Sequence, residues 1–389
     1  MQATLRLPTS PLIITHELFY GASQALRDYF ILKKVSEIFV ISHPIRSENS
    51  ISYVHLYKKG KKYYSRKIRR RGAGSVVSYI VDTILSLYWG IRVIGKRDVI
   101  VCADPLSCMS GIILRILKKT DKVIFYSIDY VPRRFTNNIL NYMYHRIETF
   151  AIRQSDECWD VSARIEAGRR EFSNIPPYSF KKSIVPIGMW KNEIVRDETL
   201  MKYNKHQIIF TGTLLKKQGI DVLLEAISIT KTSIPDISLK IIGGGDYTDR
   251  VKEKIRELGL MYTVSMLGWM SDQKKIRSYI QNSAVAIALY DPAGKNEDNF
   301  TYFSDPTKLK TYSACGVPVI MTDVPHNSTE LVQAGCGVVV SYESEQVAKT
   351  LISLLTNSGL LLKMRKNAVK YIRQYTWENI YNSLYSKEI

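Results

Sequence analysis

The chain has 389 residues, of which 45% are hydrophobic and 23% are charged, and its formal net charge is +19. This length suits two domains, and the composition is that of a globular protein rather than a disordered or fibrous one. The five cysteines form no Cys-x-x-Cys pair, which excludes a zinc-ribbon spacing and favours a reduced, cytosolic setting.

The first half of the chain alternates apolar runs of strand type with helix-like segments. Such alternation predicts a parallel sheet covered on both faces, and ligands of such sheets lie at the carboxyl ends of the strands. Asp104 and Asp129 are each the last residue of a predicted strand, at that end. The predicted strands are 37–43, 98–104, 122–129, 157–162 and 183–186, and the predicted helices are 23–34, 106–118 and 137–155.

The most apolar long segment, 75–95, is interrupted by Asp82 and Arg92. We interpret it as a packed helix rather than a membrane crossing. The N-terminus lacks the pattern of a secretory leader, because Pro8 and Pro11 interrupt its apolar residues.

The positive charge peaks in the run Lys58–Arg71. Such a run is either a solvated surface loop or a site for a polyanion. No zinc finger, RNA-recognition motif or helix-turn-helix pattern accompanies it, so we expect no nucleic-acid partner. Tyr63 and Tyr64 lie among the lysines, as aromatic residues do at membrane interfaces, and this favours an anionic membrane surface.

The alternation of strands and helices begins again after about residue 206. The fold class is therefore α/β, with two Rossmann-like doubly wound domains facing across a cleft. We expect residues 1–190 and 191–375 to form them, with 376–389 a helix that packs back on the N-terminal domain. The predicted strands of the second half are 207–213, 239–246, 264–268, 284–289, 318–322 and 337–340, with helices at 221–230 and 248–258.

The stretch Ser304–Asp323 is the most informative motif. Pro306 suits the first turn of a helix, and Gly316 suits its left-handed end. The front of such a helix offers free N–H groups to a phosphate, and Lys308 and Lys310 would reinforce that attraction.

The order of the motifs in the second half resembles the family 4 retaining glycosyltransferases of the GT-B fold, of the type that builds bacterial polysaccharides. The motifs that carry the resemblance are Thr211-Gly212, Gly219-Ile-Asp221, Ile241-Ile-Gly-Gly-Gly245, Leu267-Gly268, Ala314-Cys-Gly-Val-Pro-Val-Ile320 and Glu330-Leu-Val. The resemblance implies a nucleotide-diphosphate sugar donor on the C-terminal domain and a glycan or lipid-linked acceptor on the N-terminal one. It implies no cofactor and no metal, and the sequence has no Asp-x-Asp pair. The expected place is the cytoplasm, on the inner face of the cell membrane.

The resemblance also assigns roles to individual residues. Lys217 and Lys308 would stabilise the leaving diphosphate. Asp129 stands where relatives often place a histidine that faces the acceptor; it would orient an acceptor hydroxyl or cap the helix beyond Pro132. The donor-binding candidates are Gly21, Gly212, Thr213, Gly243, Gly244, Gly245, Trp269, Ser304, Asp305, Pro306, Thr307 and Thr311.

Four habitual donor contacts of the family are absent. Phe303 and Thr311 stand where a pair of glutamates is usual, and Thr213 and Gln218 stand where arginine and lysine are usual. The chain is therefore either a variant transferase or a non-catalytic protein that binds a nucleotide sugar. A GT-B nucleotide-sugar epimerase is a further alternative.

Overall fold

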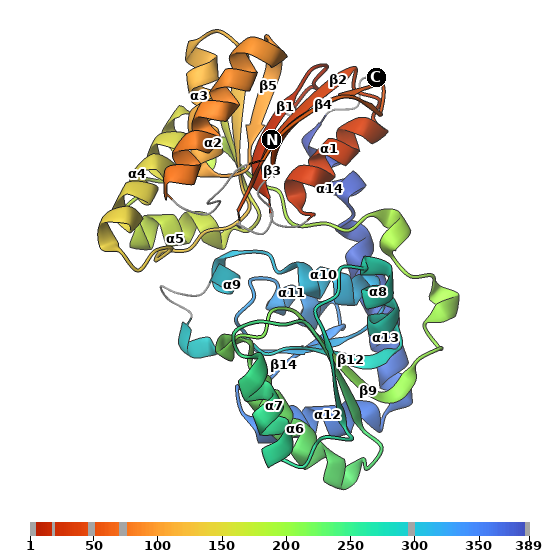
Figure 1. The fold of residues 1–389 in the computed structure, drawn as a ribbon. Coiled ribbons are helices and arrows are strands. Elements are labelled where there is room, and N and C mark those ends of the chain that lie inside the picture. The colour runs from red at the N-terminus through yellow and green to blue at the C-terminus, as the bar shows by residue number, and fades with distance from the viewer. Residues whose placement is uncertain (1–4, 18–19, 46–50, 70–75, 295–299, 386–389) are drawn as a thin grey trace. The chain divides into compact units, whose positions relative to one another are not determined.

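The computed structural model describes residues 5–17, 20–45, 51–69, 76–294 and 300–385 (Figure 1). The chain divides into two compact units. Met1–Ile187 and Trp377–Ile389 form the N-terminal unit, and Gly188–Thr376 forms the C-terminal unit.

The N-terminal unit contains an eight-stranded sheet in the order β4-β3-β2-β1-β5-β6-β7-β8. Strands β2, β1, β5, β6, β7 and β8 pair in parallel, and the hairpin β3–β4 adds two antiparallel strands at one edge. The strands are β1 (Leu12–Glu17), β2 (Glu37–Pro44), β3 (Ile51–Lys58), β4 (Lys61–Arg69), β5 (Arg97–Cys102), β6 (Thr120–Ser127), β7 (Glu157–Asp160) and β8 (Lys182–Ile184).

The helices of this unit cover both faces of the sheet, with α1 and α14 on one side and α2, α3 and α4 on the other (Figure 1). Helix α14 is hydrogen-bonded to α1: Tyr381 donates to the Ala22 carbonyl at 2.9 Å, and Tyr29 donates to Asn382 at 3.0 Å. The helices are α1 (Ala22–Leu32), α2 (Val76–Trp89), α3 (Pro105–Ile116), α4 (Asn138–Gln154), α5 (Arg164–Phe172) and α14 (Trp377–Leu384).

The C-terminal unit contains a six-stranded, fully parallel sheet in the order β11-β10-β9-β12-β13-β14. Its central strand β12 is buried along its whole length, as expected of a strand covered on both faces. The strands are β9 (Asn204–Thr211), β10 (Ser238–Ile242), β11 (Val264–Gly268), β12 (Ser283–Ala288), β13 (Val319–Met321) and β14 (Gly337–Val339).

Helices α6, α7 and α12 pack with one face of this sheet, and α8 and α10 with the other. The helices are α6 (Ile220–Ser233), α7 (Thr248–Glu257), α8 (Gln273–Gln281), α9 (Phe300–Phe303), α10 (Thr307–Ala314), α11 (Ser328–Gln333), α12 (Ser344–Leu355) and α13 (Ser358–Gln374). The predicted α/β class with two parallel-sheet domains is thus confirmed.

The sequence did not resolve β1 or the hairpin β3–β4. The basic run lies mostly on this hairpin: Lys58 ends β3, Lys59 and Gly60 form the turn, and β4 carries the rest to Arg69. Residues 61–69 are therefore solvent-exposed, as one of the two interpretations expected, but they form a strand and not a loop. Arg70 and Arg71 lie outside the described residues.

Candidate functional site

The three glycine turns after β9, β10 and β11 join at the carboxyl edge of the C-terminal sheet. The Gly212 N–H donates to the Ile242 carbonyl at 3.0 Å, and the Gly243 N–H donates to the Gly268 carbonyl at 2.9 Å. The Leu214 N–H donates to the Gly244 carbonyl at 3.0 Å. The backbone of all three turns is therefore held in one assembly at the edge where doubly wound folds bind ligands.

Glycine is required where the first two turns meet. Gly212 and Gly243 have φ values of 139° and 145°, and a Cβ on Gly243 would lie 1.8 Å from the Gly212 carbonyl oxygen. No side chain fits at that distance. Gly244, in contrast, has no atom within 4 Å of the position of a Cβ, so its backbone borders open space.

Lys308, on the first turn of α10, reaches this assembly. A Cβ on Gly212 would lie 2.9 Å from the Lys308 Nζ. The ammonium donates to the Gln218 Oε1 at 2.7 Å. It also lies over two aromatic rings, at 4.6 Å from the Phe210 centroid and 5.2 Å from that of Tyr290. Cations are attracted to ring faces within about 6 Å.

The surroundings of Lys308 destabilise its charge. Burial lowers the pKa of Lys308 from 10.5 to about 7. Within the described part of the chain, no carboxylate forms an ion pair with it. The arrangement therefore suits an incoming anion, because a phosphate beside Nζ would restore the protonated state that burial disfavours.

Lys310 has a different position from the one expected. Its side chain is 1% exposed, and its Nζ lies 3.6 Å from Asp305 and 3.4 Å from the Tyr375 ring centroid. Asp305 is also buried, with the Asn327 amide 3.4 Å away and His326 3.5 Å away. Lys310 and Asp305 thus hold the segment before α10 in place, and Lys310 does not reinforce the anion site.

The remaining donor-side candidates differ in exposure. Thr213, Thr307 and Trp269 are exposed, whereas Ser304 is buried and Gly245 is exposed beside the β10 turn. The Thr311 hydroxyl donates to the Thr307 carbonyl at 3.0 Å, which leaves its oxygen able to accept. Lys217 lies on the short turn before Gly219, where its carbonyl accepts from the Asp291 N–H at 3.0 Å. Pro306 directly precedes α10, as predicted.

Tyr312 ties the site together, and sequence reasoning missed it. Its buried hydroxyl accepts from the Thr211 N–H at 2.9 Å and lies 3.4 Å from the Ile287 carbonyl. It therefore connects the end of β9 with α10 and β12. Its spacing of four residues from Lys308 on one helix was the available signal, since such residues share a face.

At the corresponding edge of the N-terminal unit, Asp129 follows β6. Its carboxylate is half-exposed and lies 3.0 Å from the Arg134 guanidinium. The helix beyond Pro132, α4, is capped by Asn137, whose side chain accepts from the N–H groups of Ile139 and Leu140. Asp129 is therefore not a helix cap, and its carboxylate remains oriented by Arg134.

Asp104 is a helix cap that also contacts a histidine. It accepts from the Leu106 and Ser107 N–H groups at 3.0 and 2.9 Å, and the His16 Nδ1 lies 2.9 Å from its other oxygen. Burial opposes ionisation, but His16 and these donors outweigh it and lower the pKa of Asp104.

Gly21 directly precedes α1 and donates its N–H to the Gln24 side chain at 2.8 Å.

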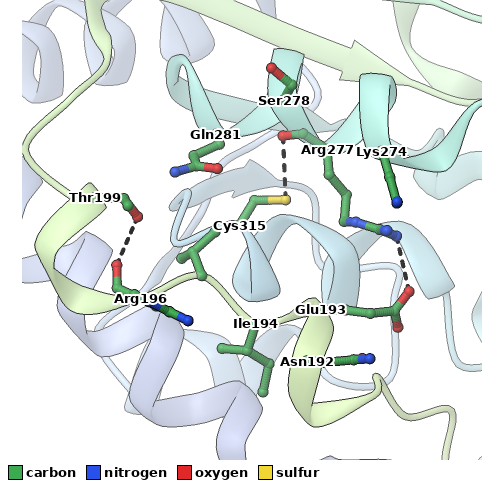
Figure 2. A pocket seen from close by; sticks show the side chains of 11 residues that line it. Asn192, Glu193, Ile194, Arg196, Thr199, Lys274, Arg277, Ser278, Gln281 and Cys315 are labelled. Carbon is green, nitrogen blue, oxygen red and sulfur yellow. Dashed lines mark hydrogen bonds and ion pairs between the residues drawn. The ribbon is translucent and has the colours of Figure 1, made fainter.

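A cavity of about 310 Å³ lies elsewhere in the C-terminal unit (Figure 2). It is lined by the 192–199 segment and by α8, and the Arg277–Glu193 ion pair of 2.9 Å borders it. It contains none of the predicted site residues. Within the described residues, no group of three or more His, Cys, Asp or Glu side chains is placed to hold a metal ion.

Residues 191–374 match the family model described as glycosyl transferases group 1. A poly(glycerol-phosphate) alpha-glucosyltransferase of Bacillus subtilis is 22% identical over 177 residues, which are 45% of this chain and 24% of that protein. The lipopolysaccharide glucosyltransferase WaaG of Escherichia coli is 23% identical over 181 residues, 46% of this chain and 45% of its own length. The chain thus covers less than half the length of these curated relatives.

Solved structures match over nearly the whole chain. Anabaena HepE, in complex with UDP-glucose, has a TM-score of 0.67 at 12% identity and covers 96% of this chain and 98% of its own. A WaaG structure has a TM-score of 0.65 at 12% identity, with coverage of 96% and 98%. The chain therefore has the fold of the GT-B glycosyltransferases, and its C-terminal unit carries the sequence pattern of glycosyl transferases group 1.

Proposed function

We propose that the chain is a metal-independent, retaining glycosyltransferase of family 4 type. It moves a sugar from a nucleotide-diphosphate donor to a glycan or lipid-linked acceptor. The observation that carries this proposal is the position of Lys308, whose half-buried ammonium lies on the glycine turns and pairs with an amide instead of a carboxylate. Such a cation is suited to a diphosphate.

The donor diphosphate lies on the turns at Gly212 and Gly243–Gly245 in this proposal. In the reaction, the bond between the anomeric carbon and the β-phosphate oxygen breaks, and the acceptor oxygen bonds to the same face of the sugar. The proton of the acceptor hydroxyl passes to the leaving phosphate. Lys308, Lys217 and the N–H groups of the turns stabilise the charge that develops on that phosphate.

The acceptor lies at the carboxyl edge of the N-terminal sheet in this proposal. Asp129 orients the acceptor hydroxyl, and Arg134 holds the carboxylate in position. A UDP-sugar is the first donor to test, because the similar HepE structures are complexes with UDP, glucose and UDP-glucose. We place the enzyme in the cytoplasm, against an anionic membrane surface that the basic run Lys58–Arg71 attracts.

A non-catalytic sugar-nucleotide binder is the second candidate. It is favoured by Phe303, whose side chain is buried and offers no carboxylate to the donor sugar, and by Thr311, which has only a hydroxyl for the ribose. An epimerase of the same fold is the third candidate, and it would change the sugar without transfer to an acceptor.

Incubation with a panel of UDP- and GDP-sugars tests the proposal, with release of the nucleotide diphosphate as the measurement. We expect release with one donor, undiminished by a chelator, and faster in the presence of a glycan acceptor. Binding without release would favour the non-catalytic candidate. Release that yields an epimerised free sugar and no acceptor product would favour the epimerase.

A further inference from the structure

Helix α2 has its polar and apolar faces reversed. The residues that it buries against the sheet include Ser78, Asp82 and Ser86, which are spaced four apart and so share one face. A surface helix of a soluble protein ordinarily buries its apolar stripe and exposes its polar one.

The outward face of this helix is apolar. Val77, Ile80 and Ile84 are 69%, 58% and 59% exposed. We call the whole outward set the apolar ridge; it comprises Val76, Val77, Ile80, Val81, Ile84 and Tyr88. Isolated exposed apolar residues are ordinary, but a contiguous ridge on one helix marks an interaction surface.

Polar contacts beneath the helix fix its rotation. The Asp82 Oδ1 lies 3.0 Å from the His43 Nδ1, and the Ser86 hydroxyl lies 2.8 Å from the His43 Nε2. The Asp82 Oδ2 lies 3.5 Å from the His16 Nε2. Turning the ridge inward would expose a carboxylate that is 1% exposed and separate it from both histidines, so the ridge must face outward.

The same contacts argue against a membrane crossing. Among the described residues, the helix Val76–Ile94 is long and apolar enough to span a bilayer, by length and composition alone, with a mean hydropathy of 1.3. If this helix spanned a membrane, Asp82 would lie in lipid. The helix would also have to leave the sheet on which it packs. The ridge is instead suited to lie flat on a surface.

Strand β4 places one cation, Arg66, on the side of the sheet that α2 covers. In the antiparallel register, Tyr64 faces Leu56 and Arg66 faces Val54. Leu56 and Val54 belong to the core cluster that includes Trp89 and contacts Leu85 of α2. Residues directly opposite on paired strands share a face, so Tyr64 and Arg66 lie on the same side of the sheet as α2.

We propose that the apolar ridge of α2 and the basic strand β4 together bind the surface of an anionic phospholipid bilayer. The ridge inserts among the acyl chains near the headgroups, and Arg66 of β4 meets the lipid phosphates. A second copy of the chain is a poorer occupant, because two such faces would bring basic strands of like charge together. This inference extends the proposed role of the Lys58–Arg71 run, but it does not depend on sugar transfer.

Vesicle flotation tests the inference, using phosphatidylcholine vesicles with and without phosphatidylglycerol. The ridge variant is Val77→Ser/Ile80→Ser/Ile84→Ser. A matched control, Met201→Ser/Met261→Ser/Val332→Ser, removes exposed apolar side chains of the C-terminal unit instead. We expect the wild type and the control to float with the anionic vesicles, and the ridge variant to bind them about tenfold or more weakly.

Equal flotation of the wild type and the ridge variant would overturn the inference. So would a dimer of the wild type that becomes monomeric in the ridge variant while vesicle binding is unchanged, since a second copy would then cover the ridge. Nucleotide release measured without vesicles should be the same in all three proteins, so a failure here is distinct from a failure of the proposed function.

A second variant keeps the test decisive if the ridge variant does not fold. In Ile84→Trp, the new indole should be quenched by brominated phosphatidylglycerol, whereas Tyr262→Trp, at a 98% exposed position of the C-terminal unit, should show no added quenching. Equal quenching of the two variants would contradict insertion of the ridge.

Discussion

The Lys308 ammonium donates a hydrogen bond to the Gln218 side-chain oxygen over 2.7 Å. Gln218 stands where the glycosyltransferases that this chain resembles often have a lysine for the diphosphate. A lysine there would meet Lys308 as a like charge. The cation is therefore supplied by α10 and oriented by an amide on the first glycine turn.

Removing the Lys308 ammonium should depress turnover. We expect Lys308→Met to lower kcat/KM for the donor by about 10²–10³-fold, the usual cost of losing one charge-stabilising group. Lys349→Met, which removes an exposed lysine of α12, serves as the control. An unchanged kcat/KM in Lys308→Met, with the control equally active, would exclude Lys308 from the reaction.

Donor binding should depend on pH through Lys308. Burial lowers its pKa to about 7, so the free protein loses this charge above neutral pH, whereas a bound diphosphate keeps it. Binding of UDP, or of the diphosphate of whichever donor reacts, should therefore weaken as pH rises from about 7 to about 9, by up to about tenfold per unit. Calorimetric titration should show this slope in the wild type and a flatter one in Lys308→Met.

The same shift has a consequence for stability. The unfolded chain holds the Lys308 proton more tightly than the folded one, because the folded pKa is the lower of the two. The Lys308 charge therefore lowers the free energy of unfolding by its full amount below about pH 7. This destabilisation decreases as the pH rises and is absent above the pKa of the unfolded chain. Lys308→Met should melt at a higher temperature than the wild type at pH 6, and a lower melting temperature there would contradict the assigned burial.

The close approach of the first two glycine turns can be tested with a matched pair. Gly243→Ala would place a Cβ 1.8 Å from the Gly212 carbonyl, whereas Gly244→Ala meets no atom within 4 Å. We expect Gly243→Ala to lower the free energy of unfolding by about 3 kcal/mol and Gly244→Ala to change it by less than about 1 kcal/mol. Denaturant titrations of both variants measure the difference, and equal stabilities would contradict the geometry.

Asp129 should affect the acceptor and not the donor. Asp129→Asn keeps the shape of the side chain but removes its charge and its ion pair with Arg134. We expect a loss of about tenfold or more in acceptor-dependent transfer, with the slow hydrolysis of the donor in water unchanged. A parallel loss of hydrolysis would instead place Asp129 on the donor side or in folding.

The strand–helix alternation was readable from the sequence because buried parallel strands are short apolar runs with sharp ends, as in β12. The Ser304–Asp323 motif was readable because Pro306 and Gly316 fix where α10 begins and ends. Hairpin β3–β4 could not be predicted from the sequence, because β4 is exposed along almost its whole length and has charged residues in place of an apolar pattern.

Side-chain partners were harder to predict than elements. Lys308 and Lys310 are two residues apart on one helix, so they point to different sides, and only the fold shows which one reaches Gly212 and which one pairs with Asp305. Asp82 interrupted an apolar segment in the sequence. Asp82 faces inward because it contacts His43 of β2 and His16 of β1, and the sequence alone does not show these contacts.

Exchanging Lys308 and Gln218 shows whether an ammonium at this place holds the donor diphosphate. The donor kcat/KM is measured for the wild type, Lys308→Gln, Gln218→Lys and the double variant Lys308→Gln/Gln218→Lys. If one ammonium at this place holds the diphosphate, the donor kcat/KM of the double variant is at least about tenfold higher than that of Lys308→Gln. A double variant no more active than Lys308→Gln, although folded and able to bind nucleotide, would show that the ammonium does not stabilise the diphosphate in the reaction.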